Sequence, residues 1–130
     1  MPNPTQAGAV VFAKDLARVA RFYEELLPMT VAHAERDHIV LQAPQFELVV
    51  HAIPKRVADS FEITVPPERR SETAIKLFFL VDSIADARVK AATLGGELDP
   101  ARNEWQARGL RACDGHDPEG NVVQLRELVA

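Results

Sequence analysis

The sequence predicts an α+β fold made of two similar halves, each with the element order β-α-β-β-β. The chain has 130 residues, of which 47% are hydrophobic and 26% are charged, and this composition is typical of one globular domain. Apolar residues alternate in several short runs and recur at helical spacing in two longer segments. The residues that cap those two helices, Asp15 and Ser83, lie 68 positions apart (83 − 15), which is close to half the chain.

The first half begins with an apolar, β-branched run at residues 9–14, which predicts a strand. Asp15 suits a helix N-cap because its carboxylate can accept a backbone N–H of the first turn, and Pro28 ends the helix. Three β-rich runs follow, separated by two short turn-forming segments. We expect these strands at about 29–34, 38–42 and 46–53.

The second half repeats this order. Residues 75–81 form a strongly apolar strand, Ser83 is the cap candidate, and Gly95 with Gly96 ends the helix. Further strands are expected at about 97–99, 104–113 and 121–128, the last two joined by the turn-rich segment DGHDPEG.

These elements define a single domain over residues 1–130, with one module at about 7–53 and a second at about 74–130. The segment 54–73 between them is rich in proline and charge, and it contains a strand-like run at 61–65. It is too long for a simple hairpin connection. Two interpretations stay open for it: a solvated crossover, or a segment that closes over a pocket.

Composition argues against several classes of function. Nineteen acidic and fifteen basic residues give a formal net charge of −4 without a basic run, which argues against binding nucleic acid. Cys113 is the only cysteine, so an internal disulfide and a cysteine-rich zinc module are excluded. No run approaches the roughly 20 apolar residues of a membrane span, and no secretory signal pattern opens the chain. We therefore expect a soluble cytoplasmic protein with no membrane partner.

Several motifs resemble those of the glyoxalase, bleomycin-resistance and extradiol-dioxygenase superfamily, the vicinal oxygen chelate fold. The residues concerned are Asp15-Leu16 after the first strand, Phe22-Tyr23, Gly95-Gly96, and above all the run DPEGNVVQLRE at 117–127. The resemblance covers nearly the whole chain except the crossover. It implies that the two modules form a curved mixed sheet around a pocket, commonly within a homodimer.

The resemblance also implies where a metal would bind. Metal-dependent members place ligands early in the first strand and in the last strand of each half, and these positions fall on Gly8, Lys76, Glu47 and Gln124. Val49 is an alternative to Glu47, because the register of that strand is open by two residues. Only Glu47 is a strong metal ligand, and the charge of Lys76 opposes a divalent ion. We therefore expect no metal and no cofactor, with a divalent metal held in an altered way as the alternative.

Lys76 and Glu47 can form a buried ion pair in place of the metal, with Gln124 completing the hydrogen bonds. This pair either fills the cavity or lets Lys76 orient an anionic or carbonyl-bearing ligand. Phe78 shares a face with Lys76 and is expected in the pocket, whereas Phe79 points to the opposite face. Trp105 and Arg108 near the rim are candidates for stacking on a planar ligand.

The remaining polar residues favour structural roles. His33 and His38 flank a turn and are read as exposed strand ends, and His51 lies about 13 Å along the strand from Glu47, which is too far for a shared ion. His116 lies in the predicted turn before the last strand. Cys113 has no nearby basic run that would activate a nucleophile.

Three hypotheses follow. The first is a metal-free, glyoxalase-like protein, similar to bleomycin-resistance proteins, that binds a small organic molecule through Glu47, Lys76, Phe78, Gln124, Trp105 and Arg108. The second is a metal-dependent lyase, isomerase or dioxygenase of the same superfamily. The third is a dimeric accessory domain whose pocket has no ligand.

Overall fold

Each half of the chain builds one β-sheet with a helix against one of its faces. The computed structural model describes residues 5–129. These fall into two units that divide after Glu62, within the segment predicted as a crossover. Each unit is considered by itself below.

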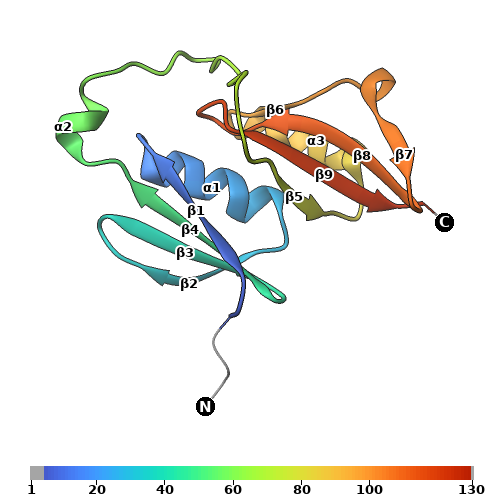
Figure 1. Cartoon of the computed structure of the whole chain (residues 1–130), viewed down its shortest axis with the longest axis horizontal. Helices are drawn as coiled ribbons and strands as arrows, with labels where there is room; N and C mark the ends of the chain where they lie inside the picture. Colours follow the sequence, from blue (N-terminus) through green and yellow to red (C-terminus); the bar gives the residue numbers. More distant parts are fainter. Residues whose placement is uncertain (1–4, 130) are drawn as a thin grey trace. The chain divides into compact units, whose positions relative to one another are not determined.

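The N-terminal unit has a four-stranded sheet in the order β1-β4-β3-β2, with α1 along one face (Figure 1). Strand β1 runs parallel to β4, and the other neighbours are antiparallel. A short helix, α2, follows the last strand. The bounds are β1 (Gly8–Ala13), α1 (Leu16–Leu26), β2 (Thr30–Ala34), β3 (His38–Ala43), β4 (Phe46–Ala52) and α2 (Lys55–Ala58).

The core of this unit lies between α1 and the sheet. Asp15 caps α1 as predicted, because its carboxylate accepts the Arg18 N–H at 3.2 Å. One apolar face of α1 is buried against β3 and β4, and this burial stabilises the unit through the hydrophobic effect. The buried side chains are Val19, Phe22 and Tyr23 of the helix and Leu41, Leu48 and Val50 of the sheet.

The C-terminal unit repeats the arrangement with a five-stranded sheet in the order β5-β9-β8-β6, with β7 paired to β8. Strand β5 runs parallel to β9, and helix α3 lies along one face (Figure 1). The bounds are β5 (Leu77–Leu80), α3 (Ile84–Thr93), β6 (Glu97–Leu98), the 3-10 turn η1 (Ala101–Asn103), β7 (Trp105–Ala107), β8 (Leu110–His116) and β9 (Val122–Leu128).

Helix α3 begins and ends where the sequence predicts. Ser83 Oγ accepts the Asp86 N–H at 3.1 Å, and Gly95 adopts a φ of 89° that lets the Gly96 N–H return to the Ala91 carbonyl at 3.0 Å. The helix covers the sheet face that carries Phe79, Val123 and Leu125, all buried.

Three local predictions are wrong. The strand expected at 104–113 is a hairpin of β7 and β8, because Arg108 and Gly109 adopt positive φ values of 53° and 76° and turn the chain. Strand β8 continues to His116, so the turn before β9 is shorter than DGHDPEG. The run at 61–65 forms no strand, and the crossover carries α2 instead.

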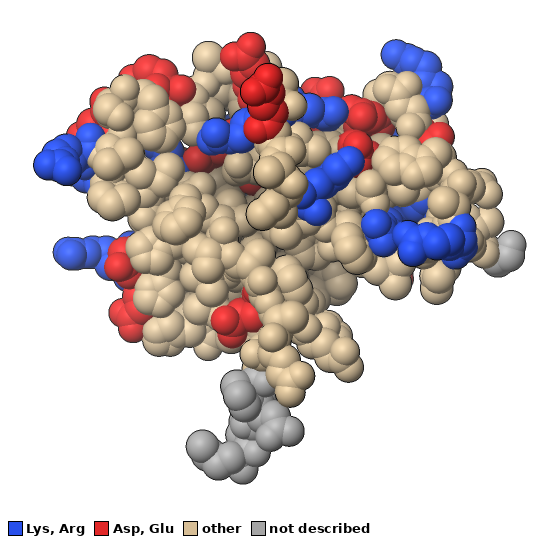
Figure 2. Space-filling model, viewed as in Figure 1, with Lys and Arg blue, Asp and Glu red and all other residues tan. Residues whose placement is uncertain are grey.

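Acidic and basic side chains are mixed on the surface (Figure 2), in agreement with the 19 acidic and 15 basic residues of the sequence. The face seen in Figure 2 carries both acidic and basic side chains, with large uncharged areas between them. Among residues 5–129, no helix is both long and apolar enough to cross a membrane.

Candidate functional site

The C-terminal sheet packs one face against α3. The opposite face is called the open face here because it bears no described helix of this unit, and exposure on it ranges from 57% at Phe78 to 8% at Gln124. Strand register determines which side chains share that open face, because paired residues in a sheet point to the same side. Phe78 pairs with Gln124 across β5 and β9, and Asp114 pairs with Gln124 across β8 and β9. Lys76 lies two residues before Phe78 and therefore on the same side. The sheet thus gathers these four side chains, as the sequence predicts for Lys76, Phe78 and Gln124.

A hydrogen-bonded network connects the polar groups of this open face. Lys76 Nζ donates to Asp114 Oδ2 at 2.9 Å, and Gln124 Nε2 donates to Asp114 Oδ1 at 3.2 Å. The Gln124 Oε1 atom accepts from Arg126 Nε at 2.7 Å. Both ends of the Gln124 amide and both oxygens of Asp114 are therefore engaged by protein groups.

Aromatic side chains border the network. The Arg126 guanidinium carbon lies 3.6 Å from the centroid of the Phe78 ring, which is cation–π geometry. Phe78 is nevertheless 57% exposed. Trp105 pairs with Ala112, which itself pairs with Arg126, so Trp105 shares this face and is 42% exposed. Arg108 lies in the exposed turn between β7 and β8. The face thus combines cationic groups with open aromatic surface.

Asp114 and Arg126 are the functional candidates that the sequence analysis missed. Asp114 provides the carboxylate that Lys76 was expected to find in Glu47. Glu47 belongs to the N-terminal unit, so its ion pair with Lys76 stays a prediction, as does a pocket enclosed by both modules. In the hairpin of β8 and β9, His116 pairs with Val122 next to the turn, and counting two residues outward on each strand pairs Asp114 with Gln124. This count was the signal that could have identified Asp114.

The two parallel strand pairs share one register, which answers the open question about Glu47. Val10 pairs with Val49 in the N-terminal unit, and Phe78, its equivalent 68 positions later, pairs with Gln124. The internal equivalent of Gln124 is therefore Val49, whereas Glu47 pairs with Gly8. Glu47 remains on the open face of its sheet, because Glu47 and Val49 are two residues apart.

The residues at the family's metal positions do not fit a divalent ion. Gly8 offers no ligand, and a Cβ added there would lie 2.3 Å from the Glu47 carbonyl oxygen. Lys76 presents an ammonium bound to Asp114, and the amide of Gln124 is held by Asp114 and Arg126. By register the remaining position is Val49, which is apolar. Three of the four positions therefore cannot supply a side-chain ligand: Gly8 and Val49 have no ligand atom, and Lys76 is cationic.

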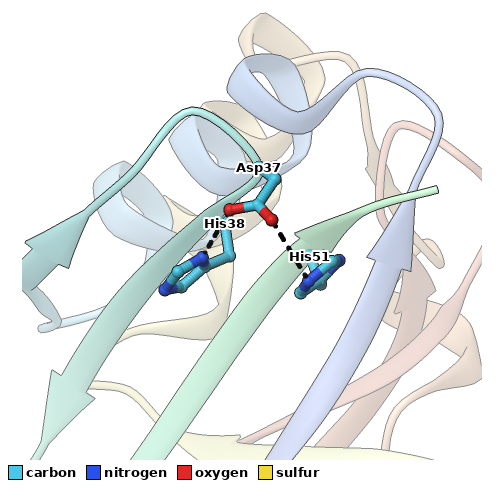
Figure 3. A group of neighbouring side chains, drawn as sticks. All are labelled: Asp37, His38 and His51. Atoms are coloured by element: carbon cyan, nitrogen blue, oxygen red, sulfur yellow. Dashed lines mark hydrogen bonds and ion pairs between the residues drawn. The ribbon is translucent and has the colours of Figure 1, made fainter. Parts of the chain in front are cut away.

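A second polar cluster lies on the N-terminal unit, where β3 and β4 meet the β2–β3 turn. His38 and His51 are direct partners across β3 and β4, and Asp37 precedes His38. His38 Nδ1 donates to Asp37 Oδ1 at 2.8 Å, and His51 Nε2 lies 3.9 Å from Asp37 Oδ2 (Figure 3). The His38 hydrogen bond lowers the pKa of Asp37 below its ordinary value, and charge on the two imidazoles acts in the same direction.

The sequence analysis separated these residues. His33 and His38 were expected as exposed strand ends on either side of a turn, and His51 was compared with Glu47, so the pairing of His38 with His51 was not predicted. The two imidazoles are stacked, with ring centroids 5.8 Å apart and planes 9° from parallel. The register of β3 and β4, counted from their short connection, was the available signal.

His116, expected in the turn before β9, is the last residue of β8, and the buried Asp117 follows it in the turn. The buried Asp117 carboxylate accepts the backbone N–H groups of Glu119 and Asn121 and the Asn121 side-chain amide. The Nδ1 atom of the buried His116 lies 3.0 Å from the Asp117 carbonyl oxygen. Burial raises the pKa of the Cys113 thiol, although Arg88 nearby opposes this shift, so the thiol stays protonated and a poor nucleophile.

Several solved structures resemble this chain in fold. A glyoxalase/bleomycin resistance protein/dioxygenase family enzyme from Burkholderia phytofirmans has a TM-score of 0.64 at 17% identity, covering 94% of this chain and 97% of its own. A glyoxalase-related enzyme from Fulvimarina pelagi has a TM-score of 0.66 at 18% identity, with coverages of 93% and 86%. The fosfomycin resistance protein FosX from Listeria monocytogenes has a TM-score of 0.66 at 16% identity, with coverages of 100% and 94%.

These similarities confirm the predicted α+β fold of the vicinal oxygen chelate type, with two mixed sheets. The curated proteins offer no significant match to this sequence. The model of the glyoxalase-like domain matches residues 8–126, which is nearly the whole chain. The chain therefore belongs to the glyoxalase-like domain family.

Proposed function

We propose that this protein binds a small organic molecule that carries an anionic or carbonyl group, on the open face of its C-terminal sheet, with no metal at the family's metal position. The network of Lys76, Asp114, Gln124 and Arg126 beside the exposed Phe78 is the observation that carries this proposal. We infer that the network occupies the place where metal-dependent relatives hold an ion.

Lys76 is the group that contacts the ligand. Its ammonium has three N–H donors, Asp114 accepts one of them, and the side chain is 40% exposed. Lys76 and Arg126 carry two positive charges against the single negative charge of Asp114. This balance favours an anionic or strongly polar group over a cationic one.

Phe78 and Trp105 supply the apolar contact. Both are aromatic, and both leave much of their surface exposed on the same sheet face. Aromatic surface next to a few oriented polar groups is typical of small-molecule sites. A ligand with a planar or apolar body and one anionic or carbonyl group matches this combination.

Thermal shift and calorimetry with benzoate, benzaldehyde and phenylphosphonate test the proposal. Fosfomycin joins the panel because several similar structures are fosfomycin resistance proteins. We expect at least one compound to stabilise the protein, and Lys76→Ala to weaken its binding by about tenfold or more, which corresponds to about 1.4 kcal/mol. Lys90→Ala, an exposed lysine of α3, is the matched control and leaves binding unchanged.

Two results would overturn the proposal. One is that no compound in the panel binds, and the other is that a binding compound is held equally well by Lys76→Ala. Metal analysis adds a further test, because a stoichiometric ion that Glu47→Gln or Gln124→Ala releases would favour the metal-dependent alternative.

The assembly is proposed on the family resemblance and the composition. We infer a cytoplasmic homodimer with no nucleic-acid or membrane partner, and the net charge of −4 supports the part that concerns nucleic acid. Light scattering behind a sizing column tests the dimer, and a molecular mass of one chain would contradict it.

A further inference from the structure

The N-terminal unit contains a cluster that the proposed function does not use. Asp37, His38 and His51 each offer one donor atom, and these atoms all lie within 4.8 Å of one another. We propose that Asp37, His38 and His51 bind one divalent transition-metal ion, of the class to which Zn²⁺ belongs. This inference is independent of the proposed function, since it concerns other residues on another sheet.

The hydrogen bonds of His51 orient its free ring nitrogen toward Asp37. His51 Nδ1 lies 2.8 Å from the Ala52 carbonyl oxygen, which only accepts, so Nδ1 carries the proton. In the neutral form of the ring, which is the form that binds metal ions, the other nitrogen, Nε2, therefore presents a lone pair. That atom faces Asp37 Oδ2 across 3.9 Å, and two acceptors that face each other in this way favour a cation between them.

The backbone holds the three residues in place. His38 and His51 are cross-strand partners, and the Ala52 N–H donates to the Asp37 carbonyl at 2.7 Å. The turn that carries Asp37 is thus tied to the end of β4, beside His51. A histidine ligand whose second nitrogen donates to a carbonyl is the arrangement that commonly fixes the ring in metal sites.

The donor types and spacing suit a transition metal. Two imidazoles and one carboxylate are typical ligands of Zn²⁺, and in a tetrahedral site with bonds of about 2.0 Å the donors lie about 3.3 Å apart. The three donor atoms all lie within 4.8 Å of one another, so small side-chain rotations bring them to this spacing. Binding the ion displaces the proton that His38 Nδ1 donates to Asp37 in the metal-free chain. His38 and His51 have exposed side-chain fractions of 28% and 39%, so water can reach a fourth position.

This ion would be distinct from the one that metal-dependent relatives hold. His51 lies four residues beyond Glu47 along β4, which corresponds to about 13 Å. An ion at Asp37, His38 and His51 therefore takes no ligand from Glu47, and substitutions separate the two positions cleanly.

Calorimetric titration of the purified protein with Zn²⁺, in a buffer without chelators, tests the inference. We expect one ion per chain, and a loss of about tenfold or more in affinity for each of Asp37→Asn and His51→Gln. His33→Gln, a neighbouring histidine outside the set, and Glu47→Gln, a carboxylate on the same strand as His51, leave the affinity unchanged. Because all four positions are at least partly exposed, circular dichroism is expected to show the same fold for every variant.

Titration with Co²⁺ adds a spectroscopic readout, since its visible absorption reports direct ligation. We expect this absorption in the native chain and in Glu47→Gln, and its loss in His51→Gln. Absence of Zn²⁺ binding, or binding that His51→Gln retains, would overturn the inference. Binding that disappears in Glu47→Gln but persists in Asp37→Asn would place the ion at Glu47 and would also overturn the inference.

Discussion

The two units follow the same plan on the side that faces their helices and differ on the open side. Leu48 and Val50 of β4 correspond by register to Val123 and Leu125 of β9, and all four are buried apolar residues. On the open side, Val49 and His51 correspond to Gln124 and Arg126. The comparison teaches that burial against the helix constrains half of each strand, while the other half is free to acquire different chemistry.

The last hairpin of each unit differs in the same way. The β3–β4 connection is short and exposed, and Gln45 adopts a φ of 61° there. The β8–β9 connection is buried around the Asp117 carboxylate, and Gly120, with a φ of 82°, lies so close to Glu68 that an added Cβ would be 2.1 Å from its carbonyl oxygen. The C-terminal turn is therefore a packed structural element, whereas the N-terminal turn is a surface loop.

The largest expected effect separates these two turns. Asp117→Ala removes the acceptor of three hydrogen bonds in a buried turn, so we expect a loss of about 3 kcal/mol in the free energy of unfolding. Gln45→Gly relieves a positive φ at an exposed position and is expected to change stability by less than about 1 kcal/mol. Urea denaturation measures both. Equal effects would mean that the two turns do not differ as described.

A smaller loss of stability is expected when Gln124 on the open face of the C-terminal sheet is replaced by the residue type found at the equivalent N-terminal position. Gln124→Val introduces the residue type found at Val49 and leaves Asp114 and Arg126 without their amide partner, at an expected cost of about 1 kcal/mol. Val49→Ile is the matched control at the equivalent position, with an expected change of less than about 0.5 kcal/mol. Chemical denaturation of both variants checks this, and a stabilised Gln124→Val would show that the network opposes folding.

Lys76→Met is expected to have little effect on stability. The ion pair with Asp114 is partly exposed, so its loss costs at most about 1 kcal/mol and less at high salt. Thermal unfolding at low and high ionic strength measures this difference. A large, salt-independent loss would assign Lys76 a structural role in place of ligand binding.

The smallest expected effect is a dependence of stability on alkaline pH. Burial raises the pKa of Cys113 in the folded chain above the ordinary thiol value of 9.0, so the unfolded chain loses this proton first. The folded state then binds more protons, and stability falls as the pH rises through the unfolded pKa and on to the folded one. The native chain should lose stability relative to Cys113→Ala between about pH 8 and pH 10. A constant difference over that range would contradict the burial of the thiol.

Sequence periodicity predicted most of the fold because the helix-facing residues follow it. The caps at Asp15 and Ser83 and the two-module plan derive from local patterns with strong physical causes. The hairpin at Arg108 and Gly109 was missed because a single apolar-polar run covers both strands. The alternation of apolar and polar residues does not reveal that Arg108 adopts a positive φ.

The candidate site was less predictable, because it depends on register across strands. Lys76, Phe78 and Gln124 were identified through the family resemblance, and the strands do bring them to one face. Asp114 and the pairing of His38 with His51 depend on which residues oppose each other, and a shift of one residue would move them to the other face. Short-range patterns do not determine that choice.

Anomalous diffraction from crystals grown with Zn²⁺ would test the central claim most directly, that a Lys76 network replaces the metal of related proteins. We expect Lys76 Nζ hydrogen-bonded to Asp114, no ion coordinated by Gln124 or Glu47, and anomalous density at Asp37, His38 and His51. An ion coordinated by Gln124 or Glu47, with the Lys76 side chain turned away from Asp114, would contradict it.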